Sequence, residues 1–285
     1  MQLEHQASEE SRHGAAVTVG VVQFTPGADA AANLAALGDH VRAAAGRGAR
    51  VVIAPEYAMH AVRRLDQRVL PAAQPLDGPF VTGLTALARE TGVFLVAGMI
   101  ETGSAGPERI RNTLVAVDPA GELVAVYRKV HLYDAFGHKE SDVVEPGPLT
   151  EPPTFSADGL TIGLQTCFDL RFPEGFRRLA AAGAHLIAVP AQWIPGQGKV
   201  DQWTTLLRAR AIENTVYLAA ADQAEPLGSG SSMIIDPAGV VLAELGDAPG
   251  VLTATAELDR LTAVRGRNPS LSLRRFEIIE RAGQE

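Results

Sequence analysis

The sequence predicts an α/β fold with four layers, an αββα sandwich, formed by one domain with two pseudo-symmetric halves. Apolar, β-rich stretches alternate with Ala- and Leu-rich helical stretches, as is typical of α/β proteins. The same order of elements occurs twice, and both series end in a hairpin around the turn Asp-Pro-Ala-Gly. If helices cover one face of each sheet, the two remaining apolar faces must pack together, which gives the sandwich.

The first half is expected to follow a β-α-β-α-β order and to close with a hairpin. Strands are predicted at 16–24, 50–54 and 93–100, and helices at 30–45 and 81–90. The hairpin is predicted over 112–127. Its turn is Asp118-Pro119-Ala120-Gly121, where proline suits the second position of a type I turn and glycine suits the fourth.

The second half is expected to repeat this order. Strands are predicted at 160–166, 185–189 and 216–221, helices at 174–182 and 201–214, and a hairpin around Asp236-Pro237-Ala238-Gly239. Turns of this kind are common, so the shared turn alone is a weak repeat signal, but the matching element order strengthens it. We therefore expect a single domain over 16–270, with a flexible tail at 1–15 that lacks signal-peptide character and a C-terminal tail at 271–285.

Composition narrows the classes of partner and compartment. The net charge is −8, and clustered Lys and Arg are lacking, so nucleic acid is not expected as a partner. No apolar run approaches the length that a membrane span needs. Only one cysteine is present, which excludes an internal disulfide and a cysteine-rich metal site and indicates a reducing compartment, so we expect a cytoplasmic protein.

That cysteine, Cys167, follows the predicted strand 160–166 and precedes Pro173-Glu174, which resembles the start of a helix. The thiol is therefore expected at the carboxyl end of a strand, the edge of an α/β sheet at which ligands bind. A lone cysteine is often a small core residue, and position alone leaves both interpretations open. The charged residues that follow it favour a nucleophile, since an inert core cysteine needs no such neighbours.

Three further residues interrupt the apolar pattern. Glu56 follows the buried strand around Val51-Val52-Ile53, where a partly desolvated carboxylate is suited to act as a base, although a salt-bridged loop glutamate is the ordinary alternative. Lys129 follows the first hairpin and could stabilise an oxyanion or a thiolate, or be a surface lysine. Glu140 lies in a polar loop and is unremarkable by itself.

Together these residues resemble the nitrilase, or carbon–nitrogen hydrolase, superfamily, over about residues 16–280. The resemblance rests on three motifs in the superfamily's order: Pro55-Glu56 after a strand, Arg128-Lys129-Val130-His131-Leu132, and Cys167-Phe168-Asp169-Leu170-Arg171-Phe172-Pro173-Glu174. It implies the nitrilase-like αββα fold. It also implies a catalytic triad of Glu56, Lys129 and Cys167, with Glu140 as a second catalytic glutamate.

The chemistry implied by the resemblance is hydrolysis of an amide through a cysteine thioester. Glu56 would take the thiol proton, Cys167 would attack the carbonyl carbon, and Lys129 with the backbone N–H of Phe168 would hold the oxyanion. Glu140 would orient the substrate or assist the base. This chemistry needs no metal and no cofactor. We interpret His131 and His138 as structural or loop residues rather than zinc ligands, because the histidines lack paired ligand spacing.

The motif after the nucleophile narrows the substrate. Phe168-Asp169 stands where nitrile-cleaving members have Trp-Glu, which disfavours a true nitrilase. The motif is most similar to the branch that contains ω-amidase and deaminated-glutathione amidase, which hydrolyse side-chain amides of α-keto acids. In that branch the arginine that matches Arg171 binds the substrate carboxylate. A local ion pair of Arg171 with Asp169 or Glu174 has equal weight.

The chain departs from that branch around 190–203, which leaves more than one interpretation open for other pocket residues. Trp193 takes the place of a pocket phenylalanine and either narrows the acyl site or packs in the core. Lys199 is either a second anchor for an acidic substrate or a solvated loop charge. Tyr57 and Tyr133 are candidates for the entrance of the site.

The leading function is therefore an amidase that acts on a small linear amide, with a carboxylate-bearing substrate as one form, and that releases ammonia. One alternative is an N-carbamoyl amino acid amidohydrolase, which would also release carbon dioxide. A non-catalytic interaction protein on the same fold is a second alternative, against which the intact triad argues. The resemblance also implies a homo-oligomer, in which the C-terminal tail with its alternating apolar residues would pack on a neighbouring subunit.

Overall fold

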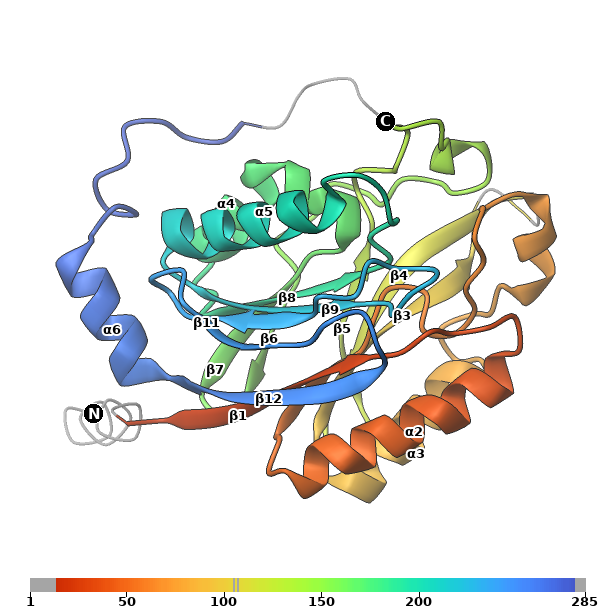
Figure 1. The fold of residues 1–285 in the computed structure, drawn as a ribbon, viewed down its shortest axis with the longest axis horizontal. Helices are drawn as coiled ribbons and strands as arrows, with labels where there is room; N and C mark the ends of the chain where they lie inside the picture. Colours follow the sequence, from red (N-terminus) through yellow and green to blue (C-terminus); the bar gives the residue numbers. More distant parts are fainter. Residues whose placement is uncertain (1–13, 105, 107, 280–285) are drawn as a thin grey trace.

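The computed structural model describes residues 14–104, 106 and 108–279 and contains two six-stranded sheets packed face to face (Figure 1). Helices α2 (Ala30–Gly46) and α3 (Pro79–Thr91) cover the outer face of the first sheet. Helices α4 (Pro173–Ala181) and α5 (Lys199–Asn214) cover the outer face of the second. The predicted αββα sandwich is confirmed.

The first sheet has the strand order β12-β1-β2-β3-β4-β5. Its strands are β1 (Ala16–Gln23), β2 (Val51–Ile53), β3 (Phe94–Thr102), β4 (Ile110–Val117), β5 (Leu123–Arg128) and β12 (Gly250–Glu257). The three central strands β1, β2 and β3 run parallel, and the outer neighbours β4, β5 and β12 pair antiparallel.

The second sheet has the order β11-β10-β9-β8-β7-β6. Its strands are β6 (Thr154–Ala157), β7 (Leu160–Leu164), β8 (Leu186–Ala191), β9 (Tyr217–Asp222), β10 (Met233–Ile235) and β11 (Val241–Glu244). Strands β7, β8 and β9 run parallel, and β6, β10 and β11 pair antiparallel. Strand directions thus match the first sheet one for one, with β7 in the place of β1 and β6 in the place of β12.

Three hydrophobic cores separate the four layers. One lies between the first sheet and helices α2 and α3, one lies between the two sheets, and one lies between the second sheet and helices α4 and α5. The middle core includes alternate residues of β1, namely Val17, Val19 and Val21, because successive side chains of a strand point to opposite faces. The alternation that the sequence shows in β1 thus positions the first sheet against the second.

Short-range signals set several element boundaries. The Asp29 side chain accepts hydrogen bonds from the backbone of Ala31 and Ala32 and caps α2, while Pro79 and Pro173 open α3 and α4. Both predicted Asp-Pro-Ala-Gly turns are present, since the N–H of Gly121 and of Gly239 donates to the aspartate carbonyl three residues earlier.

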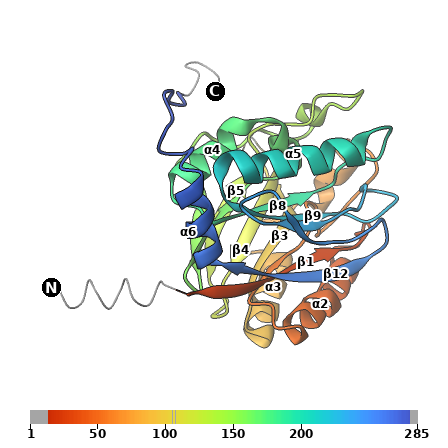
Figure 2. The same cartoon turned by 60° about the vertical axis from the view of Figure 1, so that its left-hand side comes forward.

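Several elements were not predicted. They are β6, β12, α6 (Leu258–Arg267) and the 3₁₀ helices η1 (Gln67–Ala72), η2 (Glu140–Asp142) and η3 (Cys167–Arg171). Strand β12 pairs with β1 along its full length, from Ala16 opposite Glu257 to Gln23 opposite Gly250. It therefore completes the first sheet from the far end of the chain, beside α6, as the two views show (Figures 1 and 2).

The two predicted tails fall partly outside the described residues, which do not include 1–13 and 280–285. Residues 271–279 run along the surface near the start of α4, where Pro173, Glu174 and Arg177 form a groove with residues 274–278. Leu273, Phe276 and Ile279 are exposed there. Within the described part of the chain, no helix combines the length and apolar character that crossing a bilayer requires.

Candidate active site

Cys167 lies where β7 has ended and η3 begins, in a left-handed backbone conformation with φ of 44°. The flanking turn is held by reciprocal hydrogen bonds between Thr166 and Asp169, and the Thr166 hydroxyl also donates to the Pro190 carbonyl at 2.8 Å. The thiol is 7% exposed and contacts the Gln192 carbonyl at 3.5 Å. A sharp, strained turn thus presents the predicted nucleophile at the end of a strand.

Glu56 follows β2 through Pro55, at the same edge of the sandwich. Its carboxylate accepts hydrogen bonds from the Asn112 amide at 2.6 Å and from the Lys129 ammonium at 3.0 Å on one oxygen. The other oxygen accepts the backbone N–H of Gln192 at 2.7 Å. Three donors therefore fix a carboxylate that is 1% exposed.

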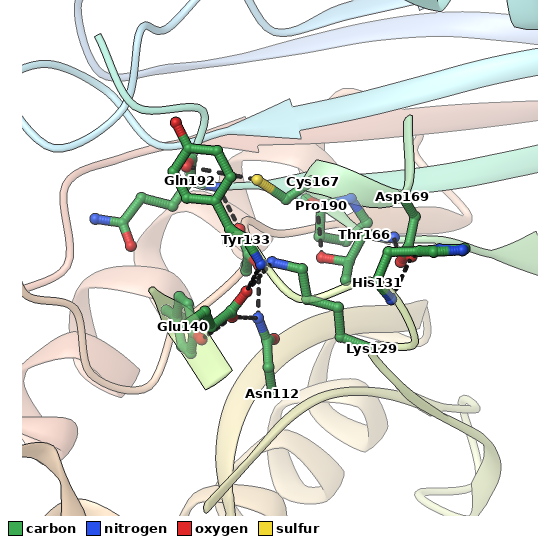
Figure 3. Close-up of polar contacts among 12 residues, drawn as sticks. Asn112, Lys129, His131, Tyr133, Glu140, Thr166, Cys167, Asp169, Pro190 and Gln192 are labelled. Carbon is green, nitrogen blue, oxygen red and sulfur yellow. Dashed lines mark hydrogen bonds and ion pairs between the residues drawn. The ribbon is translucent and has the colours of Figure 1, made fainter. Parts of the chain in front are cut away.

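Lys129 comes directly after β5, and its side chain extends toward Glu140 (Figure 3). Its ammonium lies 3.0 Å from Glu56 and 2.9 Å from Glu140, and all three side chains are buried. The structure therefore brings together the predicted triad and the second glutamate, in which Lys129 is the shared cation.

Glu140 is the first residue of η2 and is more than a polar loop residue. One oxygen accepts from the Tyr57 hydroxyl at 2.8 Å, and the other accepts from the Tyr133 backbone N–H at 2.6 Å. Tyr57, like Cys167, has a positive φ, of 55°. Both predicted entrance tyrosines thus contact Glu140, one through its hydroxyl and one through its backbone.

Asn112 is a site residue that the sequence analysis missed. It lies in β4, and its amide nitrogen donates both to Glu56 at 2.6 Å and to Glu140 at 3.0 Å, while its backbone carbonyl accepts from the Lys129 N–H. The available signal was a polar pair, Asn112-Thr113, inside a strand that is otherwise apolar from Leu114 onward. A buried asparagine thus links the two carboxylates that Lys129 also joins.

Burial and charge compete in this cluster. Burial alone would lower the pKa of Lys129, but the charges of Glu140 and Glu56 outweigh it and raise that pKa well above its ordinary value. Burial alone would raise the pKa of Glu140, but Lys129 and the hydrogen bonds to the carboxylate lower it. The Lys129–Glu140 ion pair thus remains charged despite its burial.

The environment of the Cys167 thiol, in contrast, favours its uncharged form. Burial, and then the charge of Glu56, raise the pKa of Cys167 well above its ordinary value, and Lys129 opposes this only in part. The free protein therefore holds a protonated thiol beside the charged Lys129–Glu140 pair. This is the starting state of a nucleophile that loses its proton to a neighbouring base when a substrate arrives.

Asp169 is buried at the centre of η3, and its hydrogen bonds hold the turn that carries Cys167. It accepts hydrogen bonds from the Tyr127 hydroxyl at 2.7 Å and the Thr166 N–H at 3.2 Å, and it contacts His131 Nδ1 at 2.7 Å. The His131 ring stacks on Phe172 with centroids 3.8 Å apart. These contacts agree with a structural role for His131.

A cavity of about 470 Å³ opens beside the thiol. Its lining includes Glu56, Lys129, Glu140 and Cys167, together with the predicted residues Tyr57 and Tyr133 and the loop residue His138. The remaining wall comes mainly from residues 62–67 and 137–143. The cavity volume is that of a small-molecule site.

Arg171 and Trp193 do not line this cavity and lie beside it. Neither predicted ion pair of Arg171 is present, since its guanidinium donates to the Gln202 side chain at 2.7 Å. Trp193 is buried in the core between α5 and the second sheet. Lys199 is the first residue of α5 and is 8% exposed, so it is not a solvated loop charge.

These residues form what we call the cation–aromatic cluster, defined as Arg171, Lys199, Tyr133, Phe136 and Trp193. The Arg171 guanidinium lies over the rings of Phe136 and Trp193, at 5.4 Å and 4.9 Å from the centroids. The Lys199 ammonium lies over all three rings, at 4.6 Å to 5.5 Å. The cluster shares Tyr133 with the cavity and therefore adjoins it.

No group of three or more His, Cys, Asp or Glu side chains with a geometry suited to a metal ion occurs among residues 14–104, 106 and 108–279. The buried ionisable groups beside the thiol of Cys167 in this cavity include the carboxylates of Glu56 and Glu140 and the ammonium of Lys129. The arrangement can therefore provide a nucleophile, a base and an oxyanion partner from protein side chains.

Comparison with known proteins gives a consistent result. A sequence model described as carbon–nitrogen hydrolase matches residues 18–266. A Mycobacterium tuberculosis protein described as a hydrolase is 40% identical over 265 residues, which cover 87% of this chain and 92% of that protein. The human deaminated glutathione amidase is 35% identical over 278 residues, which cover 93% of this chain and 84% of that enzyme.

Among solved structures, an amidase from Nesterenkonia sp. superposes with a TM-score of 0.77 at 30% identity, covering 91% of this chain and 94% of that one. That structure shows covalent addition of the acetamide moiety of fluoroacetamide at the active-site cysteine. The residues matched by the family model, 18–266, contain Glu56, Lys129, Glu140 and Cys167.

Proposed function

Because the chain belongs to the carbon–nitrogen hydrolase family, and is thus an enzyme that cleaves carbon–nitrogen bonds of the amide type, we propose that it hydrolyses a small linear amide through a thioester on Cys167. We further propose that the acyl part of the substrate carries a carboxylate. The observation that carries the mechanism is the position of Lys129, buried 3.0 Å from Glu56 and 2.9 Å from Glu140 beside the only cysteine.

The first half-reaction forms the acyl-enzyme. Glu56 takes the proton of Cys167, and the sulfur bonds to the amide carbon as the carbonyl π electrons move to oxygen. The Lys129 ammonium and the Phe168 backbone N–H stabilise that oxyanion. Among the described residues nothing accepts the Phe168 N–H, so this donor is available. Glu56 then gives its proton to the departing nitrogen, and ammonia leaves as the thioester forms.

The second half-reaction releases the acid. Glu56 takes a proton from water, the hydroxide oxygen bonds to the thioester carbon, and the carbon–sulfur bond breaks with return of the proton to Cys167. The sum is amide plus water giving carboxylic acid plus ammonia. One oxygen of Glu140 accepts from the Tyr57 hydroxyl and the other pairs with the Lys129 ammonium. Glu140 therefore assists by holding these two side chains in place.

The substrate class rests on Arg171 and on the named relatives. Deaminated glutathione amidases are among the proteins that this chain resembles at 34% to 39% identity. Arg171 lies four residues after the nucleophile, at the far end of the same 3₁₀ helix, and no carboxylate side chain of the described residues pairs with it. A substrate carboxylate is its natural partner.

A panel assay tests the proposal. Ammonia release is measured with glutaramate, α-ketoglutaramate, N-carbamoyl amino acids and simple aliphatic amides, and release of the free peptide amine is measured with deaminated glutathione. Cys167→Ala is the control for background. We expect turnover of carboxylate-bearing linear amides that is lost in Cys167→Ala, and an acyl adduct on the intact protein after acid quench. Carbon dioxide release from N-carbamoyl amino acids would instead favour the carbamoyl amidohydrolase. Retention of turnover in Cys167→Ala would overturn the mechanism.

The oligomeric state is a separate proposal. The exposed side chains of Leu273, Phe276 and Ile279 form an apolar strip of the kind that a subunit contact covers. We propose a homo-oligomer in which residues 271–285 pack on a neighbouring subunit. Light scattering of the full chain and of a chain ending at residue 270 should show a smaller assembly for the shorter chain. Equal masses would contradict this.

A further inference from the structure

The cation–aromatic cluster contains two positive charges that no acidic side chain neutralises. Among the described residues, neither Arg171 nor Lys199 has a carboxylate oxygen within ion-pair distance. Arg171 donates to the neutral Gln202 amide, and its Nε is buried without an acceptor. The Lys199 ammonium lies over the faces of three aromatic rings. A buried lysine beside a half-buried arginine is costly unless an anion joins them.

The cluster lies close to the nucleophile on two sides. Tyr133 contacts the ring of Phe168, the residue after Cys167, with centroids 5.1 Å apart. Trp193 follows Gln192, whose carbonyl lies 3.5 Å from the Cys167 sulfur. Negative charge at Cys167 and positive charge at Arg171 both act on the pKa of the Tyr133 phenol, after burial. These contacts place the cluster next to the turn that carries Cys167, on the side of the cavity that Tyr133 lines.

The placement of Lys199 has no structural explanation of its own. It is the first residue of α5, the end of a helix at which a cation is unfavourable. Burial lowers its pKa, the charge of Cys167 opposes this, the charge of Arg171 lowers the pKa further, and the charge of Asp222 raises it. Its backbone carbonyl does have a structural role, since it accepts the Trp193 indole N–H at 2.8 Å, but this contact does not depend on the lysine side chain.

We propose that Lys199, beside Arg171, makes the acyl end of the site doubly cationic, so that the enzyme accepts an acyl group ending in a carboxylate and rejects one that also carries an ammonium group. This deepens the proposed function and rests on it. It assigns to Lys199 the discrimination between an amide of a deaminated acid and the corresponding amide of an amino acid.

Two physical effects produce the rejection. A substrate ammonium beside the carboxylate would approach the Lys199 ammonium in a poorly hydrated site, where repulsion between like charges is strong. Aromatic rings could otherwise attract that ammonium, but the faces of Phe136 and Trp193 are already occupied by the protein's own two cations. The rings therefore hold the cations in place and do not bind the substrate.

Glutaramate and glutamine test this proposal, because they differ only in the ammonium group. In the wild-type enzyme kcat/KM for glutaramate should exceed that for glutamine. In Lys199→Met, which keeps an unbranched side chain of similar length but removes the charge, the ratio should fall by about 10- to 100-fold. Arg267→Met removes one positive charge from α6, away from the cavity, and should leave the ratio unchanged. Lys199→Arg should keep most of the discrimination.

A binding measurement separates this proposal from the proposed function. Glutarate has no amide, and its binding to the Cys167→Ala protein can be followed by calorimetry without turnover. Adding Lys199→Met should weaken that binding about 10-fold or more. If the wild-type enzyme hydrolyses neither test amide but glutarate binding depends on Lys199, the proposed function fails and the doubly cationic subsite stands. An unchanged ratio with unchanged glutarate binding in Lys199→Met would overturn the subsite.

Discussion

The carboxylate of Glu56 accepts the backbone N–H of Gln192 at 2.7 Å, so a side chain that follows a strand of one sheet is held by the backbone of the other. The backbone carbonyl of Glu56 also accepts the Gln223 side-chain amide at 2.8 Å. Gln192 in turn contacts the Cys167 sulfur. The base and the nucleophile are therefore positioned by the packing of the two sheets, in addition to their own turns.

Replacement of Asn112 should reduce turnover more than substrate affinity. Asn112→Ala removes the donor that links Glu56 and Glu140, so both carboxylates gain freedom while the thiol and Lys129 remain. We expect kcat to fall by up to about 100-fold with little change in KM. Asn33→Ala, at another buried asparagine that bonds only backbone carbonyls and the Gly27 N–H, is the control and should lower stability without this loss of kcat.

Lys129→Met should destabilise the fold and abolish activity. Without the ammonium, two buried carboxylates face each other unpaired, which typically costs about 3–5 kcal/mol of unfolding free energy. Urea denaturation measures this loss. Adding Glu140→Gln should restore part of the stability without restoring activity. Equal stability of Lys129→Met and the wild type would contradict the role of Lys129 as the shared cation.

Acid stability should depend on Glu140. Its pKa is lowered in the folded protein, so its ionised form contributes stability above the ordinary glutamate value of 4.5, and this contribution is lost as the pH falls through the lowered value. Unfolding free energy measured between pH 6 and pH 3 should therefore decline less steeply in Glu140→Gln. A variant curve parallel to that of the wild type would show that Glu140 does not contribute.

Alkylation of Cys167 in the free enzyme should increase with pH and show no plateau near neutrality. Burial and Glu56 raise the thiol pKa well above its ordinary value of 9.0, so the thiolate fraction grows about tenfold per pH unit from pH 7 to pH 9. Iodoacetamide labelling followed by mass spectrometry measures the rate. A rate that levels off at pH 7 would indicate a preformed thiolate and another activation mechanism.

Gly98→Ala should misplace Glu56. Gly98 lies in β3 opposite the Glu56–Tyr57 turn, and an added Cβ would lie 2.5 Å from the Tyr57 nitrogen and 2.7 Å from the Glu56 Cα. Because backbone atoms cannot yield as a side chain can, both stability and kcat should fall. Gly46→Ala is the matched control, because no atom lies within 4 Å of the added carbon there, and it should lower neither stability nor kcat.

The sequence predicts those parts of this protein that depend on local pattern. Cys167, Glu56 and Lys129 interrupt apolar stretches where strands end, and their motifs identified the family. Asn112 could not be found in this way, because a polar residue within a strand has the same pattern whether it faces solvent or a buried carboxylate. Strand β12 was missed because its Ala-Thr alternation is weak and its partner β1 lies more than 200 residues away.

The side-chain contacts of Arg171 also could not be predicted from the sequence. Its expected local partners, Asp169 and Glu174, are in the same segment, but the structure turns the guanidinium toward Gln202 of α5 and the rings of Phe136 and Trp193. Those neighbours come from three separate segments. Their meeting depends on how α5 packs against the end of β8, which no short-range pattern encodes.

The two sheets match strand for strand, yet corresponding strand ends carry different groups. Strand β7 leads to Cys167, whereas its counterpart β1 leads to Phe24; strand β2 leads to Glu56, whereas its counterpart β8 leads to Gln192 and Trp193. A repeated framework therefore supports a single, undivided reaction centre. If the halves arose by duplication, they have since specialised so that each lacks what the other supplies, and neither half could act alone.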